Sequence, residues 1–262
     1  MSTDAGSQGP QAGVPHKVAL VTGGSRGIGA ACAVLAARRG YAVAVSYRED
    51  RAAAGGVVRS IEQAGGTAIA IHADVASEAE VVAMFATVDR ELGRVTALVN
   101  NAGIVAPARR VDQYDLERLQ RVFATNVIGS FLCAREAIRR MSTRHGGGGG
   151  AIVNMSSAAA RLGAPNEYVD YAASKGAIDT MTVGLAKELA AEGIRVNAIR
   201  PGLIYTDIHA SGGEPGRVER LREMVPMRRG GTPEEVANAV LWLLSDEASY
   251  LTGALIDVSG GR

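Results

Sequence analysis

The sequence has only two cysteines, Cys32 and Cys133, and they lie far apart within stretches of helical pattern. A disulfide framework needs more cysteines, so we expect reduced thiols in the core of a protein from a reducing compartment. No apolar run reaches the roughly 20 residues that a membrane-spanning helix requires. Residues 1–15 also lack the apolar segment of a signal peptide. We therefore predict a cytoplasmic protein with a flexible tail over residues 1–15 and no membrane partner.

A strong charge of either sign is absent as well. The formal net charge is +1, and acidic and basic residues are mixed along the chain without a long block of either. Nucleic acids and anionic membranes bind proteins through concentrated positive charge. We therefore predict no nucleic-acid partner, and we predict no metal site.

What the sequence does contain is a regular alternation of short apolar runs with helical patterns. The runs expected to form strands are 17–21, 42–45, 68–71, 95–99, 151–155, 194–199 and 254–258. The longest expected helices cover residues 115–140 and 171–192. This alternation predicts one α/β domain over residues 16–262, built on a doubly wound, mostly parallel seven-stranded sheet with helices on both faces.

A glycine-rich segment joins the first expected strand to the first expected helix. Glycines permit a tight turn and close approach of the backbone, while a helix N-terminus offers N–H groups and a positive dipole end to a pyrophosphate. The segment therefore favours a dinucleotide site, although the glycines could instead serve only close packing of helix on strand. The residues expected to contact the cofactor are Gly23, Ser25, Arg26, Gly27, Ile28 and Gly29.

The end of the second expected strand bears on the choice between NAD and NADP. NAD binding normally uses an Asp or Glu there, which accepts a hydrogen bond from the ribose 2′-hydroxyl. This chain has Tyr47 and Arg48 instead. Arg48 and Arg26 are candidates for pairing with the 2′-phosphate of NADP, because a guanidinium suits bidentate phosphate contact. We predict NADP over NAD; the alternative is that Glu49 and Asp50 neutralise a solvated Arg48.

Tyr171 and Lys175 form a Tyr-x-x-x-Lys pair at the start of an expected helix. The i, i+4 spacing places both side chains on one helix face. A nearby cation favours the phenolate, so we expect a lowered phenol pKa and a tyrosine that can exchange a proton near neutral pH. Tyr168 has no such partner, because position 172 is alanine. The same spacing occurs on many solvated helix faces, so the pair needs support from other motifs.

Such support comes from segments that lie in order between about residues 17 and 261. They are the glycine turn at 22–29, residues 100–103, Asn126, the serine pair 156–157, the Tyr171 and Lys175 pair, and residues 201–202. Together they resemble the short-chain dehydrogenase/reductase family. The resemblance implies a single Rossmann-type domain that binds a nicotinamide cofactor and transfers a hydride between it and a carbonyl or alcohol carbon of a small substrate.

The resemblance also implies roles for single residues. Tyr171 is similar to the general acid/base, and Lys175 to the residue that lowers its pKa and holds the nicotinamide ribose. Ser157 resembles the hydroxyl that holds the substrate oxygen, although Ser156 remains open because strand neighbours face opposite sides. Asn126 resembles an amide that holds a relay water, but it could instead satisfy a backbone group at a helix kink. The other implied cofactor contacts are Asp74, Val75, Asn101, Ala102, Gly103, Pro201, Gly202, Ile204 and Thr206.

Two segments are expected to shape the substrate pocket. Residues 161–170 contain one residue more than the spacing typical of many family members. Residues 203–231 are rich in Gly and Pro, which favours a mobile lid over the substrate, with a surface loop without a role as the alternative. Pocket candidates there, equally plausible as packing residues, are Tyr205, Met224, Val225 and Met227.

The substrate and the assembly stay open at this stage. Within the same chemistry, 3-oxoacyl-carrier-protein reductases and sugar or polyol dehydrogenases are both candidates, and a basic patch for the carrier protein would use Arg109, Arg110, Arg228 and Arg229. A non-catalytic NADP-binding regulator on the same fold is the alternative from another class. From the resemblance we also expect a homotetramer or homodimer, paired through the helices that begin near residues 115 and 171.

Overall fold

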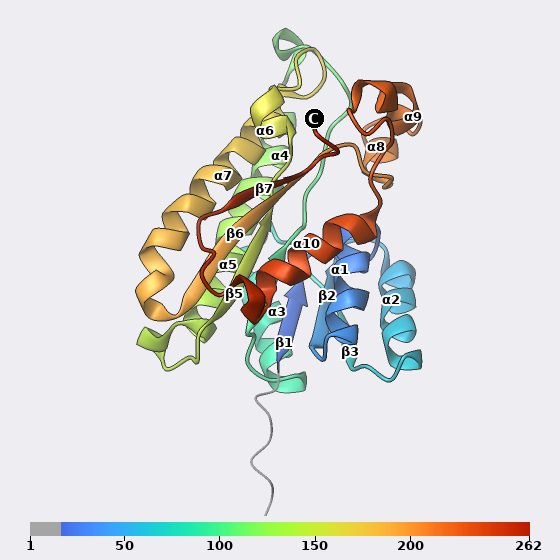
Figure 1. Cartoon of the computed structure of the whole chain (residues 1–262). Coiled ribbons are helices and arrows are strands. Elements are labelled where there is room, and N and C mark those ends of the chain that lie inside the picture. The colour runs from blue at the N-terminus through green and yellow to red at the C-terminus, as the bar shows by residue number, and fades with distance from the viewer. Residues whose placement is uncertain (1–16) are drawn as a thin grey trace, which may run out of the picture.

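The computed structural model describes residues 17–262, which form one seven-stranded sheet with helices around it (Figure 1). All neighbouring strands are parallel, in the order β3-β2-β1-β4-β5-β6-β7. This confirms the predicted fold class; the predicted tail over residues 1–15 lies outside the described residues. The strands are β1 (Val18–Val21), β2 (Ala42–Tyr47), β3 (Ala68–His72), β4 (Ala97–Asn100), β5 (Gly150–Met155), β6 (Ile194–Pro201) and β7 (Leu255–Val258).

The strand order changes direction between β1 and β4, and ligands of open α/β sheets bind where the carboxyl ends of such strands diverge. The residues that follow β1, β4, β5 and β6 are the ones that the sequence analysis assigned to the site. In Figure 1, the short helices α6 (Ala159–Leu162), α8 (Ile208–Ser211) and α9 (Arg217–Leu221) gather at this same end of the sheet. The topology thus collects the candidate residues at one edge.

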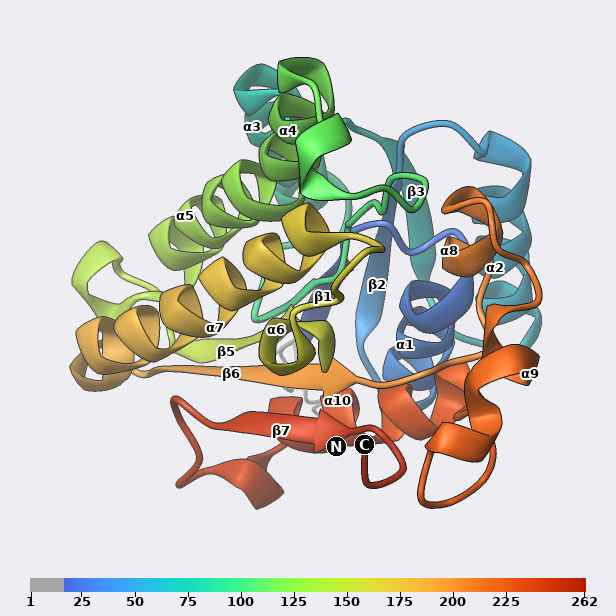
Figure 2. The same ribbon diagram turned by 90° about the horizontal axis from the view of Figure 1, so that it is seen from above.

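Apolar layers cover both faces of the sheet, which explains why its strands are short, nearly continuous apolar runs. Successive residues of β1 alternate between the two layers, as the pleat requires. The layers lie on opposite sides of the sheet when the molecule is seen from above (Figure 2). One layer includes α1 (Gly27–Arg38), α2 (Arg51–Gln63) and α10 (Pro233–Leu244); the other includes α3 (Glu78–Glu91), α5 (Gly129–Met141) and α7 (Val169–Leu189).

The two cysteines lie in different layers, Cys32 in the α1 layer and Cys133 in the α5 layer. Both are free thiols and fully buried, and burial raises the pKa of each to about 12. They therefore act as small apolar core residues, as the sequence analysis expected.

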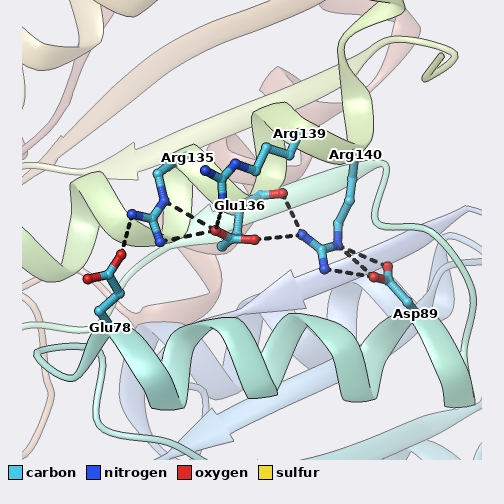
Figure 3. A network of polar contacts seen from close by, with 6 residues as sticks. All are labelled: Glu78, Asp89, Arg135, Glu136, Arg139 and Arg140. Atoms are coloured by element: carbon cyan, nitrogen blue, oxygen red, sulfur yellow. Dashed lines mark hydrogen bonds and ion pairs between the residues drawn. The ribbon is translucent and has the colours of Figure 1, made fainter. Parts of the chain in front are cut away.

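A charged network joins α5 to α3 in the second layer (Figure 3). Arg135 joins Glu78 of α3 to Glu136, at 2.6 and 3.1 Å, and Arg140 joins Asp89 of α3 to the same Glu136, at 2.7 and 3.0 Å. Although burial opposes ionisation of Glu136, the surrounding arginines hold its pKa below the usual range. The network therefore joins α5 to α3 at two points, Glu78 and Asp89.

The long helix predicted over residues 115–140 is not a regular α-helix throughout. It consists of α4 (Leu116–Phe123), a π-helical turn at Ala124–Ile128, and α5. Asp115 caps its start by accepting a hydrogen bond from the backbone N–H of Arg118 at 2.7 Å. The π-helical turn contains Asn126, and such turns often occur at functional sites.

Residues 203–231, which we call the cover segment, are more ordered than the predicted loop. They contain α8, α9 and a 3-10 turn at Arg222–Met224. Leu203, Val218, Leu221 and Val225 form a small apolar cluster of their own, separate from the two main layers. Val225 is therefore a packing residue here and not an open pocket wall. Among residues 17–262, none of the helices combines the length and apolar character needed to cross a bilayer.

Candidate active site

The glycine turn after β1 has the backbone shape that its sequence requires. Gly23 and Gly27 have φ angles of +60° and +55°, a left-handed conformation that residues with a Cβ rarely adopt. A Cβ on Gly29 would lie 2.5 Å from the carbonyl oxygen of Gly23. α1 begins at Gly27, and among the described residues its N-cap residue Arg26 makes no capping hydrogen bond with its side chain. The first N–H groups of α1 thus suit a phosphate group.

The residues after β4 hold this turn in place. The Thr22 hydroxyl accepts hydrogen bonds from the backbone N–H groups of Asn101 and Ala102, at 2.9 and 3.0 Å. The Asn101 side chain donates to the carbonyl oxygens of Thr22 and Gly23, at 2.9 and 3.0 Å. The structure therefore brings together the first and second predicted cofactor motifs, which are about 80 residues apart in sequence, through direct hydrogen bonds.

The residues after β6 approach the same turn. A Cβ on Gly27 would lie 3.2 Å from the Thr206 methyl group, so glycine at this position permits close approach of the cover segment. Gly202 packs against Ser259, and Ile204 forms a β-bridge with Gly231. Of the predicted 201–206 contacts, Thr206 thus lies directly beside the glycine turn.

Arg48 is not a free cation in this structure. Its Nε donates to a Glu49 carboxylate oxygen at 3.1 Å, and its guanidinium lies 3.8 Å from Asp74, another predicted cofactor contact. Asp50 instead caps α2 by accepting from the Ala53 N–H at 2.8 Å. The alternative in which neighbouring acids neutralise Arg48 is therefore the arrangement observed, with Asp74 in the place expected for Asp50.

A second cation near Tyr47 was missed by the sequence analysis. Arg51, the first residue of α2, lines a surface hollow of about 530 Å³ together with Tyr47. The available signal was its position three residues beyond Arg48, at a helix start. The other lining residues are Ala52, Gly55, Arg59 and Ala70.

Tyr171 lies in the first turn of α7, which begins at Val169, two residues earlier than predicted. Lys175 is buried, donates to the carbonyl oxygen of Met155 at 2.7 Å, and lies 5.5 Å from the centroid of the Tyr171 ring. Burial lowers the Lys175 pKa to about 8, although Asp179 opposes this. The i, i+4 pair therefore forms as predicted, with the ammonium anchored on β5.

The predicted direction of the Tyr171 pKa is wrong in this structure. Burial raises it, and the Ser157 hydroxyl opposes the rise. The reason is that Lys175 directs its ammonium to a backbone carbonyl, while the half-buried phenol is partly withdrawn from water. Helical spacing shows the proximity of the two groups but not their desolvation.

The two serines after β5 differ in their surroundings. Ser156 is only 2% exposed and donates to the backbone carbonyl of Lys175 at 3.2 Å, so it joins β5 to α7. Ser157 is half-buried, accepts a hydrogen bond from the Ala159 N–H at 3.1 Å, and lies beside the Tyr171 phenol. Of the pair, Ser157 is the one placed to act with Tyr171.

Asn126 uses its amide to hold the chain after β4. Its Oδ1 accepts from the Ile104 N–H at 2.8 Å, and its Nδ2 donates to the Ile104 carbonyl and to Ser174 Oγ, both at 3.0 Å. A Cβ on Gly103 would lie 3.4 Å from both the Asn126 Oδ1 and the Lys175 Nζ. The structure thus shows the backbone-satisfying arrangement at a helix irregularity, and it also places this amide near Lys175.

The start of α7 is fixed by an ion pair that the sequence analysis missed. Arg118 of α4 donates to both carboxylate oxygens of Asp170, at 2.7 and 3.2 Å, and to the Pro107 carbonyl at 2.6 Å. Its guanidinium also stacks on Tyr114, 4.1 Å from the ring centroid. Asp170 directly precedes Tyr171, so this buried pair fixes the backbone that carries the phenol.

A parallel sheet with a glycine turn at its switch point and a Ser, Tyr and Lys set after β5 defines a Rossmann-type oxidoreductase. A family model described as "Enoyl-(Acyl carrier protein) reductase" matches residues 23–262. The chain belongs to the short-chain dehydrogenase/reductase family, as the sequence motifs predicted, and it is an oxidoreductase of that type.

Relatives with diverse names span nearly the whole chain. The "Uncharacterized oxidoreductase YgfF" of Escherichia coli (strain K12) is 59% identical over 94% of this chain and 99% of that protein. The "3beta-hydroxysteroid dehydrogenase 1" of Eggerthella lenta is 42% identical over 94% of this chain and 93% of its own length. The structure of a 3-ketoacyl-(acyl-carrier-protein) reductase from Brucella melitensis complexed with NADH is similar, with a TM-score of 0.87, 34% identity, and coverage of 94% of this chain and 98% of that one. The family therefore does not by itself specify the substrate.

Proposed function

We propose that this protein is an NADP(H)-dependent oxidoreductase that interconverts a carbonyl group and a secondary alcohol on a small substrate. The observation that carries the proposal is the meeting of Ser157, Tyr171 and Lys175 at the carboxyl end of β5. Gly103, which follows β4, lies beside the same lysine. A phenol, a hydroxyl and an ammonium thus share one site next to the glycine turn.

The residues around the glycine turn fit a nicotinamide dinucleotide. The left-handed glycines and the open start of α1 would hold the pyrophosphate. The segments 101–103 and 201–206 flank that position, and Lys175 would hold the nicotinamide ribose. A bound nicotinamide supplies or accepts the hydride in this chemistry.

The protein's own groups handle the proton. A tyrosine with an ordinary pKa of about 10 is protonated at neutral pH, and burial shifts the Tyr171 pKa further upward. The phenol can therefore protonate a substrate oxygen during carbonyl reduction. The Ser157 hydroxyl would donate a hydrogen bond to that oxygen as negative charge develops on it. Alcohol oxidation needs the phenolate as the base, so it should be faster at higher pH, where the phenolate forms.

Turnover by a Tyr171→Phe variant tests this assignment. We expect kcat to fall about 10²- to 10⁴-fold, since the substitution removes the proton donor and keeps the ring. The assay is loss of the absorbance of reduced nicotinamide over a panel of ketones, 3-oxoacyl thioesters and sugars. Tyr250→Phe makes the same chemical change at a fully exposed tyrosine and serves as the control. Near-full turnover by Tyr171→Phe would contradict the proposal.

The NADP preference is supported by the lack of an acidic residue at positions 46 and 47. It is also supported by Arg48, which follows β2, and by Arg51 and Arg59, which line the hollow beside Tyr47. A 2′-phosphate would compete with Glu49 for Arg48, and Arg51 beside Tyr47 offers a further cation. We expect NADPH to bind more tightly than NADH in a fluorescence titration. Arg48→Gln and Arg51→Gln should weaken NADPH binding and leave NADH binding unchanged, with exposed Arg121→Gln as control. Tighter binding of NADH by the wild-type protein would overturn the preference.

Substrate size is open, but two observations bear on an acyl carrier protein. Of the arginines considered for its docking, Arg110 pairs with Asp112 and Arg229 pairs with Glu235, which reduces the positive charge available. The pocket candidates Tyr205, Met224 and Met227 are exposed by 43%, 65% and 60%, which suits a substrate with apolar surface. The substrate panel above compares these classes directly.

A homotetramer or homodimer is also part of the proposal. Large apolar side chains are exposed along the run from α4 to α5: Leu116 by 68%, Ile128 by 52% and Phe131 by 49%. Such residues are typical of a surface that a second copy covers. Light scattering would give the molecular mass in solution, and a monomer at micromolar concentration would count against this assembly.

A further inference from the structure

Arg217 is a buried cation in the cover segment. It donates to both carboxylate oxygens of Glu167, at 2.6 and 2.9 Å, and to Glu214 at 2.9 Å. Glu214 belongs to the cover segment, whereas Glu167 lies just before α7. Burial opposes the charge of Arg217, but the hydrogen bonds to Glu167 and Glu214 hold its pKa above the usual value, so the guanidinium stays charged. One side chain thus fastens the cover segment to the start of the Tyr171 helix.

The same guanidinium also contacts the aromatic residue next to the site. Its central carbon lies 4.9 Å from the centroid of the Tyr168 ring. Tyr168 in turn packs edge-to-face on Tyr171, with centroids 6.4 Å apart and an interplanar angle of 86°. Such cation–π and edge-to-face contacts are each favourable and depend on geometry. Arg217, Tyr168 and Tyr171 therefore form a continuous stack from the cover segment to the phenol.

Two further contacts place the cover segment over the chain that follows β4. A Cβ on Gly212 would lie 3.0 Å from Val105, so α8 ends against that chain. The backbone carbonyl of Glu167 accepts from the Arg109 N–H at 2.9 Å, so Glu167 joins the same chain as well. The cover segment and Glu167, which Arg217 joins, thus both contact the chain that follows β4.

We propose that Arg217 is a positioning residue that couples closure of the cover segment to the placement of Tyr171. With the cover segment seated, Arg217 holds Glu167 and the Tyr168 ring, and Tyr168 forms the wall against which the Tyr171 ring packs. With the cover segment lifted, that wall loses its guanidinium and the phenol loses its fixed orientation. Proton transfer is then confined to the closed state, which also limits access of water. This inference rests on the proposed role of Tyr171.

Arg217→Met keeps a long side chain but removes the charge and the hydrogen-bonding fork. We expect kcat to fall about 10- to 100-fold, as for a reacting group displaced by about 1 Å, with the cofactor Kd changed less than about twofold. Arg217→Lys keeps the charge without the fork and should recover part of kcat. Arg222→Met is the matched control, because Arg222 lies in the same segment, is exposed, and pairs with Glu219 and Glu223 there.

A double-mutant cycle with Tyr168→Leu separates positioning from general stability. If Arg217 acts through the Tyr168 ring, Arg217→Met should cause little further loss of kcat in the Tyr168→Leu protein. Independent, multiplicative losses would overturn the inference. If Tyr171→Phe abolishes turnover while Arg217→Met matches the wild type, the proposed function stands and this inference fails. Near-full turnover by Tyr171→Phe would instead remove the proposed function itself.

Hydrogen exchange supplies a measurement that needs no substrate. Arg217→Met should speed amide exchange in the first turns of α7, residues 169–175, whereas Arg222→Met should not. Equal exchange in the two variants, with the rest of the fold intact, would show that Arg217 does not fix the start of this helix.

Discussion

Two buried arginines from different parts of the molecule hold the start of α7. Arg118 comes from α4, in the scaffold, and pairs with Asp170, whose side chain has no exposure. Arg217 comes from the cover segment and pairs with Glu167, whose side chain is 28% exposed, and with Glu214. We call the Arg118–Asp170 pair the scaffold clamp and the contacts of Arg217 with Glu167 and Glu214 the cover clamp. Asp170 and Glu167 both lie within four residues of Tyr171, but the two clamps join the start of α7 to parts of the chain with different packing.

The difference lies in what each clamp would leave behind when broken. Arg118 and Asp170 are enclosed by the Tyr114 ring and the Pro107 carbonyl, so water cannot readily replace either partner. Loss of one partner leaves an uncompensated buried charge, which costs far more than loss of an exposed pair. Glu167 and Glu214 are partly hydrated, so the Arg217 clamp can open at a lower cost. The scaffold therefore fixes where Tyr171 stands, and the cover segment governs when its ring is packed.

Breaking the scaffold clamp should have the largest effect. Asp170→Asn keeps the shape but removes the charge, and we expect the free energy of unfolding to fall by about 3–5 kcal/mol. Glu167→Gln should cost only about 1–2 kcal/mol, because Arg217 keeps Glu214 and its stack on Tyr168. Denaturant unfolding of the two variants measures the contrast, with Asp112→Asn as an exposed control. Equal losses at Asp170 and Glu167 would show that the clamps do not differ.

Lys175, on α7 itself, is a third buried cation. It differs from the two arginines because its direct partner is a backbone carbonyl rather than a carboxylate. Its folded pKa of about 8 lies below the usual lysine value of about 10.4, so the folded state disfavours the charged form. The resulting destabilisation is complete below pH about 8 and disappears as pH rises through the unfolded pKa. Lys175, which has no directly paired carboxylate, should therefore lower the stability of the fold below pH about 8, whereas the carboxylate-paired Arg118 and Arg217 should not.

We expect Lys175→Met to stabilise the cofactor-free protein by roughly 1–3 kcal/mol below pH 8. The gain should shrink steadily between about pH 8 and pH 10.4, as the wild type sheds its buried charge. Unfolding curves across this range give the measurement. Lys187→Met, on an exposed face of the same helix, is the control and should show no such trend. A gain that grows with pH would contradict the assigned direction of the Lys175 pKa.

The sheet could be predicted because its strands are buried on both faces, so each is a short apolar run that a helical pattern follows. The π-helical turn at Asn126 could not, since the hydrogen-bond partners of this residue, Ile104 and Ser174, are distant in the sequence. The cover segment was predicted as a loop because its Gly and Pro residues are typical of loops, although it contains two helices of four and five residues. Such short helices depend on tertiary packing rather than on local propensity.

The site divides in the same way. Tyr171, Lys175 and Ser157 lie in local motifs, so the sequence proposes them as site residues without any knowledge of distant contacts. Arg118 and Arg217 act on residues about 50 positions away, and a charged residue in the sequence does not reveal its partner at that distance. The predicted direction of the Tyr171 pKa shift was wrong for a related reason, because the burial of the phenol depends on the whole fold.

The smallest effect should come from Glu214→Gln, which weakens the cover clamp and leaves its link to α7. Arg217 retains the bidentate pair with Glu167, so we expect less than about 1 kcal/mol of lost stability. Hydrogen exchange should quicken within α8 and α9 but stay at the wild-type rate in the first turns of α7, unlike in Arg217→Met. Glu219→Gln, at an exposed acid of the same segment, is the matched control. If Glu214→Gln also loosens the start of α7, the cover segment is held to Tyr171 by the whole charge cluster rather than by the single pair of Arg217 and Glu167.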